Sequence, residues 1–168
     1  MATHVANERV VLMDAYIFKH DMGASKISDT DYYKYSTLGR GEPLSVEITL
    51  TFTAAANKPY SPAHAEITRD PGTGEFTITW TRRTRIGAAT LNGQDVPVGE
   101  TYELYRCKIL DPYTGATVRT IEVEDPVAYY TDAEQTADWG ELRTSLNVEI
   151  VQMSPALSIE GYPTDVSY

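Results

Sequence analysis

The sequence has little of what most protein chemistry requires. Its single cysteine, Cys107, excludes an internal disulfide and lies in an apolar segment, where we expect a buried and inert thiol. The three histidines, His4, His20 and His64, share no metal-ligand spacing. The chain has no nucleophile elbow, Cys–His pairing or glycine-rich phosphate loop. We therefore expect no enzymatic activity, no cofactor and no metal site.

Positive charge and long apolar runs are also scarce. The chain has 14 Lys and Arg against 24 Asp and Glu, a formal net charge of −10, which argues against binding to nucleic acid or anionic membranes. No apolar run approaches the length that spans a bilayer, and no basic segment followed by an apolar one opens the chain. We expect a protein that is made in the cytoplasm and does not insert into membranes.

What the sequence does contain is a repeated strand pattern. Phe76, Ile78 and Trp80 alternate with threonines, so the three apolar side chains share one face of a half-buried strand. The same reasoning places Tyr105, Cys107, Ile109, Leu146, Val148 and Ile150 in the core. Strands are predicted over residues 5–14, 32–35, 46–53, 63–69, 102–110, 116–123, 127–131 and 145–153, with one helical turn within 132–140.

Short strands with turn signals at near-regular spacing predict an all-β, antiparallel sandwich. Residues 59–157, with a Trp in an early strand, resemble a fibronectin type III domain. Residues 1–58 form a separate N-terminal β-region before a proline-containing linker, and residues 158–168 are expected to be a tail. A region with so few strands buries little apolar surface, so we expect the next domain or a partner chain to complete it.

Seven motifs follow one another along the chain. They are H-V-A-N-E-R-V-V-L-M-D from His4, Y-Y-K-Y from Tyr32, P-Y-S-P-A-H from Pro59, W-T-R-R-T-R from Trp80, D-V-P-V-G-E from Asp95, Y-E-L-Y from Tyr102 and Y-T-D-A-E-Q-T-A-D-W-G from Tyr130. In this order they resemble the C-terminal region of the tail-tip hub proteins of long-tailed bacteriophages and gene transfer agents.

The resemblance implies a structural virion protein at the tip of a phage tail, which caps or extends the tip or contacts the host. Family hubs are threefold assemblies, so it also implies a homotrimer whose partners are other tail-tip proteins and a host-surface glycan or receptor. In the family these residues end a longer polypeptide, whereas here a methionine opens the chain. This departure implies a hub split between genes, or a distal tip protein derived from such a fragment.

Two other functions remain open. A carbohydrate-binding adhesin module predicts saturable binding to a host polysaccharide. An accessory domain of a cell-wall hydrolase predicts turnover of peptidoglycan.

The basic cluster Arg82, Arg83 and Arg85 is one candidate interaction site. Its guanidinium groups would suit a phosphate or sugar acid on a host surface, or a carboxylate of a neighbouring subunit. The alternative is a solvated turn whose arginines pair with the chain's own acidic residues.

Aromatic residues near predicted turns form the second candidate. Tyr113 lies at the tip of a hairpin, and Tyr129, Tyr130 and Trp139 lie near loop ends, where rings stack on sugars or fill partner pockets. For Tyr130 and Trp139 we favour a structural corner of the sandwich. The D-P turns at residues 70–74 and 111–115 lack the alternating acidic ligands of a calcium loop.

Overall fold

The computed structural model describes residues 24–35, 46–87 and 96–168. The chain divides into two compact units, Met1–Thr53 and Ala54–Tyr168, and each is described by itself. The division falls a few residues before the boundary expected at residue 58. The strand predicted over residues 5–14, together with His4 and His20, lies outside the described residues.

The described part of the first unit is a 3-10 turn, η1 (Ala24–Lys26), followed by two strands, β1 (Thr30–Tyr35) and β2 (Val46–Thr51). The strands pair antiparallel, from Thr30 opposite Thr51 to Tyr35 opposite Val46. The predicted strands over 32–35 and 46–53 correspond to this pair, whose second strand ends slightly earlier than expected.

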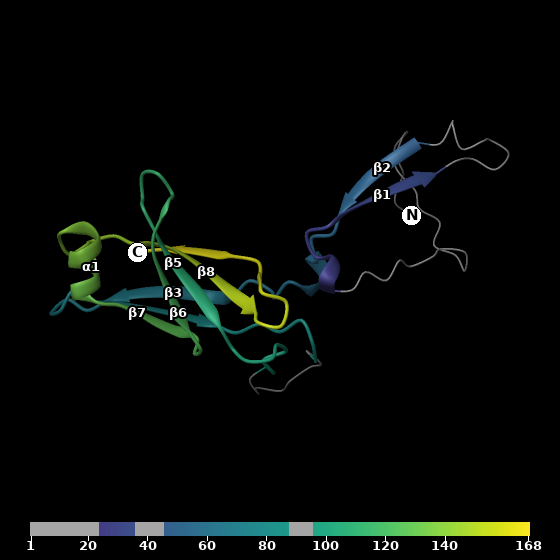
Figure 1. The fold of residues 1–168 in the computed structure, drawn as a ribbon. Coiled ribbons are helices and arrows are strands. Elements are labelled where there is room, and N and C mark those ends of the chain that lie inside the picture. The colour runs from purple at the N-terminus through teal and green to yellow at the C-terminus, as the bar shows by residue number, and fades with distance from the viewer. Residues whose placement is uncertain (1–23, 36–45, 88–95) are drawn as a thin grey trace, which may run out of the picture. The chain divides into compact units, whose positions relative to one another are not determined.

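The second unit is an antiparallel sandwich (Figure 1). One sheet has the order β3-β4-β7, and the other has the order β10-β8-β5-β6, with β9 paired to β8. This strand order is that of a fibronectin type III domain, so the predicted fold class is confirmed. The elements are η3 (Ala55–Asn57), β3 (Ala63–Arg69), β4 (Phe76–Thr81), β5 (Tyr105–Leu110), β6 (Thr117–Val123), β7 (Val127–Tyr130), α1 (Asp132–Trp139), β8 (Asn147–Ser154), β9 (Ile159–Glu160) and β10 (Thr164–Ser167).

The core lies between the two sheets and follows the alternation of the strands. Trp80 of β4 meets Tyr105 of β5 edge to face, with ring centroids 5.0 Å apart. A fully buried aliphatic or Phe side chain contributes about 1.5–3 kcal/mol, so this cluster dominates the stability of the unit. The residues predicted for the core all lie in it: Phe76, Ile78, Trp80, Tyr105, Cys107, Ile109, Leu146, Val148 and Ile150.

Two hairpin turns repeat one sequence motif, D-P-x-T-G, at residues 70–74 and 111–115. In the first turn Asp70 Oδ1 accepts two backbone N–H groups at 2.7 and 2.9 Å, and in the second Asp111 Oδ1 accepts two at 2.8 Å. Gly74 and Gly115 close the turns with φ of 81° and 70°, a left-handed conformation that favours glycine. The carboxylates therefore serve the turn geometry.

The tail expected over residues 158–168 is instead part of the sandwich. Strand β10 pairs with β8, with Val166 opposite Val148, and forms the edge of its sheet. Beyond it, Tyr168 exchanges backbone hydrogen bonds with Leu146 at 2.9 and 3.2 Å, and its ring packs on Phe76. Sequence reasoning missed this strand because four residues with one aliphatic side chain give almost no periodic signal, and the pairing partner supplies the rest.

Candidate functional site

Arg82 is tied to the connection between β4 and β5. Its Nε donates to the Val96 carbonyl at 3.0 Å, and its Nη1 pairs with Glu103 Oε2. The other oxygen of Glu103 accepts from the Tyr105 hydroxyl at 2.7 Å. Glu103 thus joins Arg82 to Tyr105, and the strand expected from residue 102 begins at Tyr105.

Arg85 makes a second ion pair, in which the carboxylate is less exposed than in the first. Its Nε lies 2.9 Å from Glu100 Oε1, and the Glu100 side chain is only 4% exposed. The second oxygen of Glu100 accepts from Ser154 Oγ at 2.6 Å, and Ser154 is buried. A carboxylate this buried needs its partner, because an unpaired charge in such a place is strongly unfavourable.

Arg83 is the exposed member of the basic cluster. Its guanidinium lies over the Tyr60 ring at 5.2 Å from the centroid, a cation–π arrangement. The structure therefore divides the cluster: Arg82 and Arg85 pair with the chain's own carboxylates, as the second interpretation predicts, and Arg83 is left as the surface candidate.

Tyr130 and Trp139 form a corner at one end of the sandwich. Trp139 Nε1 donates to the Tyr130 hydroxyl at 2.8 Å, and that hydroxyl donates to Asp138 Oδ2 at 2.9 Å. Arg119 of β6 donates two hydrogen bonds to the Asp138 carboxylate, from Nε at 2.6 Å and from Nη2 at 2.8 Å. Hydrogen bonding to Arg119 lowers the pKa of Asp138, and burial raises the pKa of Tyr130. This corner joins the two sheets, while Tyr129 remains 53% exposed.

Helix α1 positions the corner and is longer than the single turn expected. Thr131 and Glu134 form a reciprocal capping box, with hydrogen bonds of 3.0 and 3.2 Å, and Gly140 ends the helix with φ of 78°. The buried Gln135 donates to the carbonyls of Gly74 and Tyr130 at 3.0 and 3.1 Å. Sequence reasoning missed Arg119, Gln135 and Asp138, although the T-x-x-E pattern marks the helix start.

Tyr113 lies at the tip of the β5–β6 hairpin, which projects from the sheets in Figure 1. It is 92% exposed. The equivalent position of the other D-P-x-T-G turn is Gly72, and that turn forms with the same hydrogen bonds. The turn geometry therefore does not require an aromatic residue here, and Tyr113 stays a candidate contact residue.

One face of the two-stranded sheet in the first unit is mainly apolar. Residues directly opposite each other in an antiparallel pair share a face, so Tyr33 and Ile48 lie on one side together with Leu50 and, opposite it, Asp31, which pairs with Lys26. Ile48 is 50% exposed and Leu50 is 52% exposed. Within the described residues this sheet has two strands, and two strands alone are marginally stable in water. The face is thus suited to packing against another surface.

Other reactive side chains are isolated. Burial raises the pKa of the Cys107 thiol to about 12, which keeps it protonated and unreactive. His64 is exposed in β3. Within the described ranges, no group of three or more His, Cys, Asp or Glu residues is arranged to hold a metal ion. The helices in that part of the chain are too short or too polar to cross a membrane.

No protein-family model and no curated protein matches the chain. Among solved structures, it is similar to domains d3–d4 of the extracellular region of rat CD45, with a TM-score of 0.45 and 10% identity, covering 100% of this chain and 78% of that one. It is also similar to the fibronectin type III domain of human fibronectin type III domain containing protein 3, with a TM-score of 0.42 and 15% identity, covering 66% and 84%. The fold assignment rests on the strand order and pairing described above.

Proposed function

We propose that this chain is a non-enzymatic structural component of a phage tail tip, which assembles as a trimer with the neighbouring hub proteins and resides in the virion. The ordered motifs that resemble tail-tip hub proteins supply the biological setting. A fibronectin type III-like sandwich is compatible with it, because such a module offers surfaces for contact and needs no catalytic centre.

The observation that carries the assembly proposal is the apolar face of the β1–β2 sheet. Ile48 and Leu50 stand half exposed on it, and the sheet has two strands within the described residues, a number that alone is marginally stable in water. Covering these side chains with another protein surface removes apolar area from water, at about 25 cal/mol per Å². We assign the cover to a neighbouring copy of this chain, because the resemblance implies threefold symmetry.

The test is the mass of the purified chain in solution, alone and mixed with the adjacent hub protein, by size-exclusion chromatography with light scattering. A trimer, or a stoichiometric complex with the hub, is the expected result. A folded monomer that ignores the hub would overturn the proposal.

Two matched variants locate the contact. Leu50→Lys places a charge on the apolar face and is expected to abolish assembly. Thr49→Lys places the same charge on the opposite face, where Thr49 is exposed, and is expected to leave assembly intact. Equal behaviour of the two variants would show that this face is not the contact.

A further inference from the structure

On the outer face of the larger sheet, the polar side chains of one half are paired with one another, and those of the other half are not. Because Tyr105, Cys107 and Ile109 of β5 point into the core, the alternate residues Arg106 and Lys108 stand on the outer face. Their cationic groups are shared among three carboxylates at 2.7–3.3 Å: Glu122, Glu149 and Glu160. This half of the face is a closed network of ion pairs.

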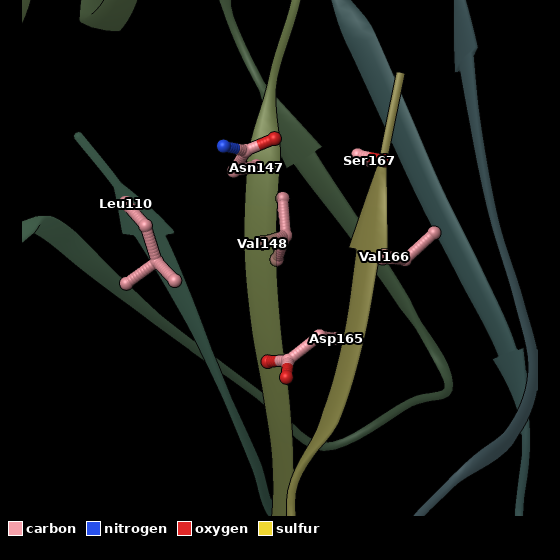
Figure 2. A pocket seen from close by; sticks show the side chains of 6 residues that line it. All are labelled: Leu110, Asn147, Val148, Asp165, Val166 and Ser167. Atoms are coloured by element: carbon pink, nitrogen blue, oxygen red, sulfur yellow. The ribbon is translucent and has the colours of Figure 1, made fainter. Parts of the chain in front are cut away.

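The other half surrounds an open depression of about 270 Å³, where β5 and β10 end on either side of the start of β8 (Figure 2). Figure 2 shows Asp165 reaching from β10 over β8, Asn147 lying on β8, and Leu110 bordering them on β5. Ser167 completes the polar lining. Within the described part of the chain, the side chains of Asn147, Asp165 and Ser167 have no hydrogen-bond or ion-pair partner.

A second, narrower hollow continues the first. It shares Leu110 and Asn147 and extends to Pro112 and Ser145, ending at Trp139. The Arg143 guanidinium covers the Trp139 ring at 4.8 Å from the centroid. The second hollow holds only about 10 Å³, so the space for a ligand lies in the first, and we call the two neighbouring hollows together the groove. Its unpaired polar groups line the larger hollow, and Leu110 and Pro112 supply apolar surface beside it.

We propose that this groove binds a neutral saccharide. A carboxylate, an amide and a hydroxyl together supply acceptors and donors for several sugar hydroxyl groups. Leu110 and Pro112 provide apolar surface for the C–H face of a sugar ring, and the exposed Tyr113 follows immediately at the hairpin tip. The Asp165 carboxylate and the net charge of −10 disfavour sugar acids and phosphates.

The test is a titration of the full, isotope-labelled chain with the methyl glycosides of glucose, galactose and N-acetylglucosamine, followed by two-dimensional NMR. At least one sugar is expected to shift the amide signals of residues 110, 147, 165 and 167 in a saturable manner. No saturable shift with any of the three sugars would overturn the proposal. So would saturable shifts at these residues with a lysine-containing peptide alone, because the groove would then be a protein contact.

Variants give a second readout. Asp165→Ala and Asn147→Ala remove exposed or half-exposed polar groups and are each expected to weaken binding about tenfold or more. Thr120→Ala, on the paired half of the same face, is expected to leave binding unchanged. Thermal unfolding of each variant checks that the sandwich is intact. Equal weakening by all three variants would contradict the location.

Saccharide binding at the groove does not require assembly through the β1–β2 sheet. A trimer that binds none of the sugars would overturn the saccharide site alone. A monomer that binds them would overturn the assembly proposal alone and favour a free-standing carbohydrate-binding module.

Discussion

Arg83 and Arg85 are two positions apart in the sequence, yet they differ in exposure to water and in whether a carboxylate lies beside them. Arg85 is enclosed beside a carboxylate that is 4% exposed, whereas Arg83 is exposed and lies over the Tyr60 ring. The cost of removing one partner of a charged pair rises as water is excluded, because the remaining charge is then buried without a partner. The cluster therefore consists of two ion pairs, Arg82 with Glu103 and Arg85 with Glu100, beside one surface cation, Arg83.

The substitution Arg85→Met is expected to lower the free energy of unfolding by about 3 kcal/mol, because it leaves Glu100 buried without its cation. Arg83→Met is the matched control, since it removes an exposed cation–π contact worth at most about 1 kcal/mol. Urea denaturation of both variants measures the difference.

A double variant, Arg85→Met with Glu100→Gln, should recover part of the loss by removing the stranded charge. If Arg85→Met were as stable as Arg83→Met, the Arg85–Glu100 ion pair would contribute nothing measurable to the free energy of unfolding. Arg85 would then return to the list of surface candidates.

Helix α1 shows how one short element closes the end of the sandwich. Its capping box fixes where the helix starts, Gln135 anchors it to two backbone carbonyls, and its last turn presents Asp138 to Arg119. An eight-residue helix is not stable by itself in water, so these tertiary contacts hold it. The motif from Tyr130 to Gly140, which carries part of the family resemblance, is therefore used within the fold.

Acid is expected to loosen this corner. The pKa of Asp138 is lowered in the folded chain by Arg119, from the ordinary value of 3.8. Its contribution to stability is therefore fully present above pH 3.8 and is lost as the pH falls through the lowered value. Urea denaturation at a series of pH values from 7 to about 2 measures the slope.

The matched variant is Asp138→Asn, which should be less stable than the parent at pH 7 by about 2 kcal/mol and should show a shallower loss towards acid. Asp70, Asp111 and Glu160 also have lowered pKa values, so part of the slope must remain. An unchanged slope in the variant would contradict the assignment to Asp138.

At the scale of the molecule, the two units differ in how they are stabilised. The whole buried core cluster belongs to Ala54–Tyr168, and both tryptophans of the chain lie there. The described part of the first unit is a two-stranded sheet with a half-exposed apolar face. The second unit is thus suited to fold by itself, whereas the first is suited to be covered.

A fragment of residues 54–168 is therefore expected to unfold in one cooperative transition during urea denaturation. Its midpoint should equal the midpoint that tryptophan fluorescence gives for the full chain, because both tryptophans lie in this unit. A fragment of residues 54–157, which ends where the tail was expected to begin, is the contrast. It lacks β10 and the Tyr168 contacts and is expected to lose cooperative unfolding. Equal stability of the two fragments would mean that residues 158–168 are dispensable.

Much of the sandwich could be predicted from the sequence, because alternation of apolar and polar residues is a local property. The inward sides of β4, β5 and β8 followed from it, as did both D-P-x-T-G turns. The candidate sites followed only in outline. The sequence places three arginines close together, but which of them is exposed depends on Glu100 and Glu103, which a long connection brings back to the cluster.

The sequence by itself determined the strand periodicity, the excess of negative charge, the absence of an internal disulfide and the type of fold, since each depends on composition or on near neighbours. Tertiary structure decided what depends on residues distant in sequence. It made Thr164–Ser167 an edge strand, joined Arg119 of β6 to Asp138 of α1, and placed Leu110, Asn147 and Asp165 around one groove. The physical reason is that a four-residue strand or a single side chain is too short to show a periodic pattern in the sequence. Its structural role depends on the surface against which the chain folds.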